Sequence, residues 1–110
     1  MTLAIAPNAY VIRIYCGMSV QGESSASIYN NSYDIIMELA DYWFGQGCTV
    51  YSATGIWMNG EEEMMIIEYV ADREVEAACE AANQLAIEYK NLNMQDAVLV
   101  TVDQTYKKIL

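Results

Sequence analysis

Histidine is absent from this chain of 110 residues. Its absence removes the side chain that most often serves as a general base and as a metal ligand, so most hydrolase and metalloenzyme mechanisms are disfavoured. The three cysteines, Cys16, Cys48 and Cys79, are widely spaced and include no Cys-x-x-Cys pair. This spacing predicts neither a disulfide framework nor a zinc site. We therefore expect no metal, no cofactor and a reducing, cytoplasmic environment.

Basic residues are scarce. The chain has five Lys and Arg and fifteen Asp and Glu, which gives a formal net charge of −10. Proteins that bind the phosphate backbone of nucleic acids typically use about six to ten cationic contacts, so direct nucleic-acid binding is close to excluded. The negative charge indicates either solubility alone or attraction to a basic protein, such as one that has a nucleic-acid groove.

Long apolar runs are also missing. No stretch approaches the roughly 18 to 20 apolar residues of a membrane span, and the N-terminus has no charged segment before a long apolar core, so neither membrane insertion nor secretion is expected. Yet hydrophobic residues make up 55% of the chain and charged residues only 18%. That composition predicts a folded domain with apolar surface that a partner covers. We expect a single domain over 1–110, with 1–8 as an N-terminal arm and 104–110 as a C-terminal tail.

The periodicity of apolar residues predicts four strands and two helices. Alternation indicates a first strand at 9–18, followed by a loop at 19–27. Helical spacing indicates a helix that begins at Asn31 or Ser32 and ends before Gly45 and a second helix capped by Asp72. The last strand is expected at 97–102.

A hairpin is predicted between the β-rich runs 48–54 and 64–70, because Asn59-Gly60 is a strong two-residue turn signal. This turn would place Tyr51 opposite Glu68 and Trp57 opposite Glu62. Gly55 is a candidate for a bulge beyond which the register shifts.

The order strand, helix, hairpin, helix, strand predicts the ferredoxin-like α+β fold, in which a four-stranded antiparallel sheet carries both helices on one face. Its other face should be polar, yet the alternation places large apolar side chains there as well. This bare face is therefore expected to be either a ligand platform or the interface of a homodimer or higher oligomer. The residues assigned to it are Val11, Tyr15, Tyr51, Trp57 and Ile66.

Chemistry on that face centres on Glu68, which interrupts an apolar run and faces the phenol of Tyr51. The two side chains could orient a ligand, transfer a proton or form a structural hydrogen bond. Arg13 lies mid-strand beside Tyr15, where it could offer its guanidinium to a phosphate or carboxylate, or pair with Glu68.

The acidic run Glu61, Glu62 and Glu63 follows the hairpin turn. Strand alternation sends Glu62 to the face opposite Glu61 and Glu63, which favours a solvated hairpin tip over a metal or acid–base cluster. If the chain binds a basic protein, this tip is the expected contact.

Two segments carry a resemblance to known proteins. The first is Val11–Met18, a strand that ends in Tyr15-Cys16-Gly17, and the second is Gly47–Trp57, which reads G-C-T-V-Y-S-A-T-G-I-W and precedes Asn59-Gly60. They resemble small hypothetical proteins of phages and prophages whose hairpin carries G-x-T-[IV]-[YF]-x-A-x-G. The resemblance implies a non-catalytic role against bacterial defence in the host cytoplasm, similar to that of oligomeric sponges that sequester cyclic-nucleotide or cyclic ADP-ribose-type signals.

Two functions from different classes follow. The first is sequestration of a nucleotide-derived signal in pockets at an oligomer interface, with stacking on aromatic rings and a guanidinium contact. The ligand-binding residues would be Arg13, Tyr15, Tyr51, Trp57 and Glu68. The alternative is an acidic inhibitor, similar to anti-CRISPR proteins, that occupies the basic groove of a host protein through its hairpin tip. An enzyme is not expected, although dimeric barrels of this fold include cofactor-free oxygenases.

Overall fold

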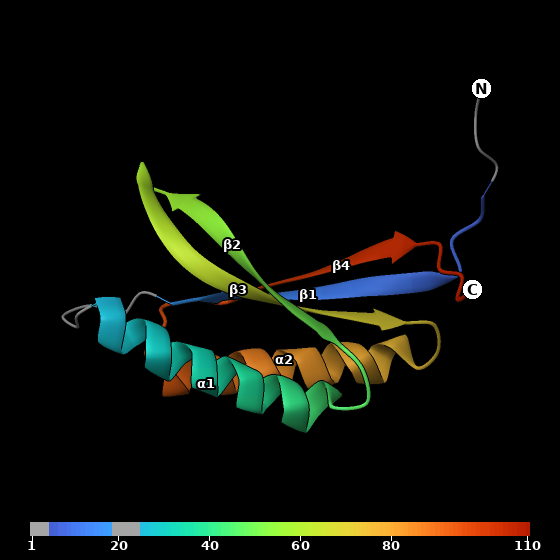
Figure 1. Cartoon of the computed structure of the whole chain (residues 1–110). Helices are drawn as coiled ribbons and strands as arrows, with labels where there is room; N and C mark the ends of the chain where they lie inside the picture. The colour runs from blue at the N-terminus through green and yellow to red at the C-terminus, as the bar shows by residue number, and fades with distance from the viewer. Residues whose placement is uncertain (1–4, 19–24) are drawn as a thin grey trace.

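A four-stranded antiparallel sheet carries two helices on one of its faces (Figure 1). The computed structural model describes residues 5–18 and 25–110, with the side chains of 25–30 and of Trp57 outside that description. The sheet order is β2-β3-β1-β4, which is the ferredoxin-like α+β fold that the sequence predicts. The elements along the chain are β1 (Ala9–Gly17), α1 (Ser25–Phe44), β2 (Thr49–Trp57), β3 (Gly60–Ala71), α2 (Val75–Leu92) and β4 (Leu99–Thr105).

The hydrophobic core lies between the sheet and the helix layer. Ile12 and Ile14 of the central strand β1 and Ile67 of β3 are at most 1% exposed, and Leu85 of α2 packs against the same layer. These residues share the alternate positions that point toward the helices. The other alternate positions of each strand point away from the helices and form the surface that we call the open face.

The hairpin loop lies one residue earlier than predicted, which shifts the pairing register by two residues. The loop is Met58-Asn59, not Asn59-Gly60, and both loop residues have positive φ angles of 49° and 64°. Two positive φ angles are what a type I′ turn requires. Trp57 therefore pairs with Gly60 rather than Glu62, and Gly55 pairs with Glu62 in an unbroken register without a bulge. A shift of two residues keeps every side chain on its predicted face.

Both helices begin elsewhere than the capping signals indicate. The first starts at Ser25, so Asn31 and Ser32 lie inside it. Of the expected loop at 19–27, residues 25–27 belong to the helix and 19–24 lie outside the described residues. The second starts after Glu74, which takes a left-handed conformation with a φ of 53° and makes no side-chain capping bond.

Asp72 is engaged otherwise: its carboxylate pairs with the Lys107 ammonium at 2.8 Å. The last strand also runs on to Thr105, so its end lies inside the expected C-terminal tail.

A buried polar cluster joins both helices to the end of β1. Ser32 Oγ donates to Asn93 Oδ1 at 2.9 Å, and Asn93 Nδ2 donates to the Tyr89 hydroxyl at 2.8 Å. The Tyr89 hydroxyl in turn donates to the main-chain carbonyl of Gly17, which Asn93 Nδ2 also approaches at 3.4 Å. Because buried polar groups are costly when unpaired, this cluster fixes where β1 ends relative to the helices.

The β2–β3 hairpin extends beyond the rest of the sheet as a two-stranded arm. The β1–β3 register ends at the pair of Gly17 and Met64, and a last hydrogen bond runs from Met18 N–H to the Glu63 carbonyl at 3.0 Å. Beyond it the two strands of the hairpin pair with each other, and the arm bends away from the helix layer (Figure 1). It therefore rises on the side of the open face. Val11 and Ile66 on that face are 8% and 7% exposed although no helix covers them. Within the described residues, no helix is both long enough and apolar enough to span a membrane.

Candidate functional site

A charged network crosses the middle of the open face. Arg13 of β1 lies opposite Glu68 of β3, and its Nε–H donates to Glu68 Oε1 at 2.8 Å. The Tyr51 hydroxyl of β2 donates to the same oxygen at 3.1 Å. Arg13 Nη1 also reaches Asp103 Oδ2 of β4 at 3.4 Å. Of the two roles that the sequence allows for Arg13, the structure shows the ion pair with Glu68.

The network sets the protonation of its members. The hydrogen bond from Arg13 to Glu68 raises the pKa of the guanidinium, which keeps it charged. Burial, followed by the hydrogen bond to Glu68, raises the pKa of the Tyr51 phenol. At neutral pH the phenol is therefore a hydrogen-bond donor. Tyr51 meets Glu68 diagonally, because its direct partner across the strands is Ile66.

Glu62 also lies on the open face, where the β2–β3 arm begins. The sequence of the acidic run does not predict this position. Its side-chain oxygen Oε1 lies over Gly17, so closely that a Cβ atom on Gly17 would overlap it, and the Gln95 side chain approaches the same point. The absence of a side chain at Gly17 thus leaves the space that the end of the Glu62 side chain occupies. The face consequently carries three carboxylates: Glu68 and Asp103 contact the Arg13 guanidinium, and Glu62 lies farther along the sheet at Gly17.

The other predicted site residues are placed as follows. Tyr15 lies on the open face, two residues along β1 from Arg13 and opposite Ile66. Trp57 ends β2, and the position of its side chain lies outside the described part. Glu61 and Glu63 are exposed and point to the face opposite Glu62, so the acidic run does not form one cluster.

Thr101 of β4 was missed by sequence reasoning. It lies opposite Arg13 on the open face, and its hydroxyl is buried without a hydrogen-bond partner among the described residues. Because this oxygen is not exposed, a bound molecule could reach it only if neighbouring side chains moved aside. No pattern in the sequence distinguishes this threonine from an ordinary strand residue.

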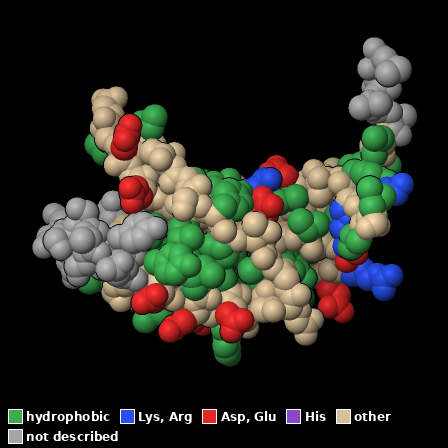
Figure 2. All heavy atoms as spheres, in the orientation of Figure 1, with side chains coloured by type: hydrophobic (Ala, Val, Ile, Leu, Met, Phe, Trp, Pro, Cys, Tyr) green, Lys and Arg blue, Asp and Glu red, His purple; other side chains and the backbone are tan. Residues whose placement is uncertain are grey.

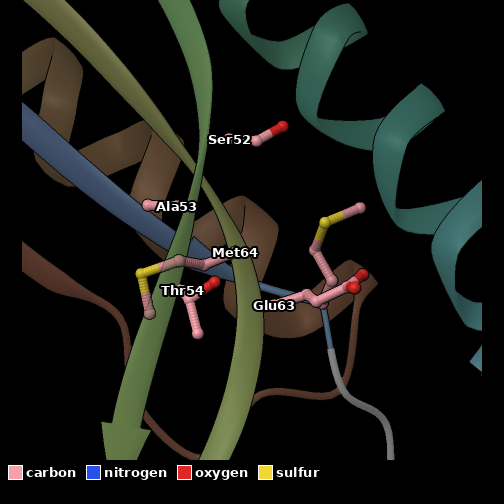
Figure 3. Close-up of a pocket in the computed structure, with 6 residues that line it drawn as sticks. Ser52, Ala53, Thr54, Glu63 and Met64 are labelled. Carbon is pink, nitrogen blue, oxygen red and sulfur yellow. The ribbon is translucent and has the colours of Figure 1, made fainter.

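A small hollow lies on the other side of the hairpin, facing α1. Its volume is about 260 Å³, and Figure 3 shows Ser52 and Glu63 pointing toward the side where α1 lies, whereas Ala53 and Met64 point away from it. Met18 and Thr54 complete its lining. Most of its lining residues point to the face opposite the network of Glu68. In the described part of the chain, no group of three or more Cys, Asp or Glu is placed to hold a metal ion.

Comparison with known proteins shows likeness in structure only. No family model and no curated protein matches the sequence. A phage SAM lyase in complex with S-methyl-5′-thioadenosine superposes with a TM-score of 0.64 at 15% identity, over 94% of this chain and 87% of that one. Its apo state gives a TM-score of 0.59 at 13% identity over the same shares. A hypothetical protein of Arabidopsis thaliana gives 0.50 at 16% identity, over 100% and 97%. At these identities the likeness shows the fold alone.

Proposed function

We propose that this chain is a phage-type anti-defence protein that sequesters an adenosine-derived small molecule on its open face. The observation that carries the proposal is the network at the centre of that face, where Tyr51 and Arg13 are both tied to Glu68. Aromatic rings provide stacking surfaces for a base, while carboxylates provide hydrogen-bond partners for ribose and amino groups. The three-dimensional likeness to a phage SAM lyase that holds S-methyl-5′-thioadenosine supports the same ligand class.

The charge of the open face limits which adenosine derivatives it can bind. The three carboxylates outnumber the single guanidinium, and two of them, Glu68 and Asp103, already occupy Arg13. A phosphate would meet net repulsion here, in a protein whose overall charge is −10. A neutral or cationic adenosine derivative, such as a thioether or a sulfonium, would not. The phosphate-bearing signals that the sequence resemblance implies are therefore the less favoured members of the class.

Holding the molecule is favoured over cleaving it. Glu68 Oε1 already accepts hydrogen bonds from Arg13 and Tyr51, so side chains of the protein occupy this oxygen before a ligand binds. The raised pKa of Tyr51 keeps its phenol protonated, so it is a poor base. The two groups are suited to orienting a ligand.

A second copy of the chain is proposed to close the site. The network lies on a sheet face that no helix covers, and Val70 and Leu99 on that face are 38% and 59% exposed. Burying them between two copies would convert an open surface into an enclosed pocket. Light scattering at micromolar concentration should give at least twice the 12.3 kDa of one chain, and a monomer would overturn this part of the proposal.

Titration calorimetry tests the ligand class. S-methyl-5′-thioadenosine and S-adenosylmethionine should give heat, whereas cyclic AMP and ADP-ribose should give none. Heat from the phosphate-bearing compounds alone, or from no compound, would overturn the proposal. Chromatography of S-adenosylmethionine after incubation with the protein separates holding from cleaving, since release of S-methyl-5′-thioadenosine would show a lyase.

The variant Glu62→Gln should weaken binding of S-adenosylmethionine, because it removes one carboxylate from the open face. Glu61→Gln makes the same charge change one residue away, on the opposite face, and serves as the matched control. Equal affinities for the two variants would place the ligand elsewhere.

A further inference from the structure

A second surface lies on the outer side of the helix layer, away from the open face. There α1 and α2 enclose a groove of about 560 Å³. Its apolar lining comes from Ile35, Leu39 and Tyr42 on α1 and from Leu92 on α2, and one carboxylate from each helix, Glu38 and Glu88, completes it. The α1 residues recur at intervals of three and four, so they form one stripe along the helix.

Two of the apolar lining residues are largely exposed. Tyr42 is 76% exposed and Leu92 59%, whereas Leu39 at the floor of the groove is 7% exposed. Exposed apolar side chains at a groove that also carries charged groups are typical of an interaction site.

The charge around the groove is of one sign. Figure 2 shows acidic side chains in a row along α1, with the Lys and Arg side chains of that view lying away from it. In the described residues, α1 carries Asp34, Glu38 and Asp41 without any Lys or Arg, and α2 carries three glutamates and the single Lys90. Among the described residues, the cations that form ion pairs are Arg13 and Lys107, and their partners are Glu68, Asp103 and Asp72. Neither Glu38 nor Glu88 is therefore neutralised by an ion pair.

We infer that this groove binds a basic amphipathic segment of another protein, most simply a helix with leucine-like side chains on one face and Lys or Arg beside them. Its apolar side chains would fill the space between Leu39, Tyr42 and Leu92. Its cations would lie between Glu38 and Glu88, where they relieve the repulsion between two carboxylates that share one groove. A nucleic acid or an anionic membrane is repelled by the same charge.

This surface is separate from the proposed ligand site, because it lies on the far side of the helices from the sheet. It also relocates the basic-partner interaction from the hairpin tip, where Glu61 and Glu63 point away from Glu62, to a surface that offers apolar area as well as charge. The inference therefore stands or falls independently of the binding of an adenosine derivative.

The experiment is a fluorescence-anisotropy titration of the full chain against a labelled 18-residue amphipathic helix made of Leu and Lys only. The wild-type protein should bind this peptide, more weakly as salt rises. Glu38→Gln with Glu88→Gln should weaken binding about tenfold, as expected for the loss of two partly desolvated charge pairs. Leu92→Ser should weaken it by a similar factor, and circular dichroism should show both variants folded, since the altered side chains line an open groove.

The matched control is Glu61→Gln with Glu63→Gln, which removes the same charge at the hairpin tip. If this control weakens binding as much as the groove variants do, the interaction is one of net charge and the inference fails. Absence of binding at about 100 μM peptide would also overturn it. If Leu92→Ser instead dissociates a self-associated form of the chain, the occupant is a second copy and not a basic partner.

Discussion

Arg13 on β1 and Glu68 on β3 face each other in the sheet register, and the Nε–H of the arginine donates to Oε1 of the glutamate at 2.8 Å. Both side chains are about one-quarter to one-third exposed, so solvent screens the pair in part. The pair nevertheless decides the charge of the open face, because it commits the only cation of the network before any ligand arrives.

The first prediction concerns the stability of that pair. Arg13→Met should destabilise the protein by about 1 kcal/mol, because Glu68 then retains only the phenol of Tyr51 as a partner. Arg73→Met, at an exposed arginine, is the control and should change the free energy of unfolding by less than about 0.5 kcal/mol. Urea unfolding measures both, and equal effects would show that the network contributes nothing to stability.

The second prediction separates the position of Glu62 from its charge. Gly17→Ala places a methyl group where the Glu62 carboxylate lies. Because the end of a flexible side chain can move aside, stability should fall by less than about 1 kcal/mol, while affinity for S-methyl-5′-thioadenosine should fall about fivefold. Gly55→Ala displaces only the end of Met64 and is the comparison. Unchanged affinity in Gly17→Ala would remove Glu62 from the site.

The third prediction compares two tyrosines on the two helices. Tyr89→Phe should cost about 1 to 3 kcal/mol, since it deprives both the Gly17 carbonyl and the Asn93 amide of a buried partner. Tyr42→Phe, where the side chain is 76% exposed, should cost less than about 0.5 kcal/mol. Chemical denaturation measures the free energy of unfolding of both variants. An unchanged free energy of unfolding in Tyr89→Phe would contradict the structural role of the cluster.

The fourth prediction is a loss of stability in alkali. Burial raises the pKa of the Cys16 thiol from 9.0 to about 12 and also raises the pKa of Tyr89. Between pH 9 and 12 the unfolded chain loses the thiol proton while the folded chain keeps it. The stabilisation is therefore complete below pH 9 and is lost as the pH rises through that window.

Measuring the free energy of unfolding from pH 8 to 11 in wild type and Cys16→Ala checks this. The slope of the variant should be shallower by up to about 1.4 kcal/mol per pH unit, the value for one proton. Parallel curves would contradict the assignment.

The sequence predicted the faces of the sheet better than its pairing. Strict alternation placed Tyr51, Glu68 and Arg13 on one surface, and the two-residue error in the register preserved that placement because side chains alternate with a period of two. The error arose because Asn59-Gly60 signals a turn without fixing which of its residues lie in the loop. The actual loop draws Met58 into a positive φ angle that a methionine seldom adopts.

The helix starts were predicted wrongly from capping residues, for a different reason. Ser32 looks like a helix start, yet it is fully buried within α1 and donates to Asn93, 61 residues away. Asp72 looks like a cap, yet it pairs with Lys107 at the other end of the chain. Such partners are set by the tertiary structure, which local patterns do not contain. The closeness of Glu62 to Gly17 is hidden in the same way.

The network on the open face takes one residue from every strand: Arg13, Tyr51, Glu68 and Asp103. Its links span 55, 17 and 90 residues of sequence. The Arg13–Glu68 link needs β1 paired with β3, and the Arg13–Asp103 link needs β4 on the other side of β1. Closing such long loops costs more entropy than forming helices or the hairpin. A chain that is cut before its last strand lacks Asp103, so Glu68 is then the one acidic partner of Arg13 in the network.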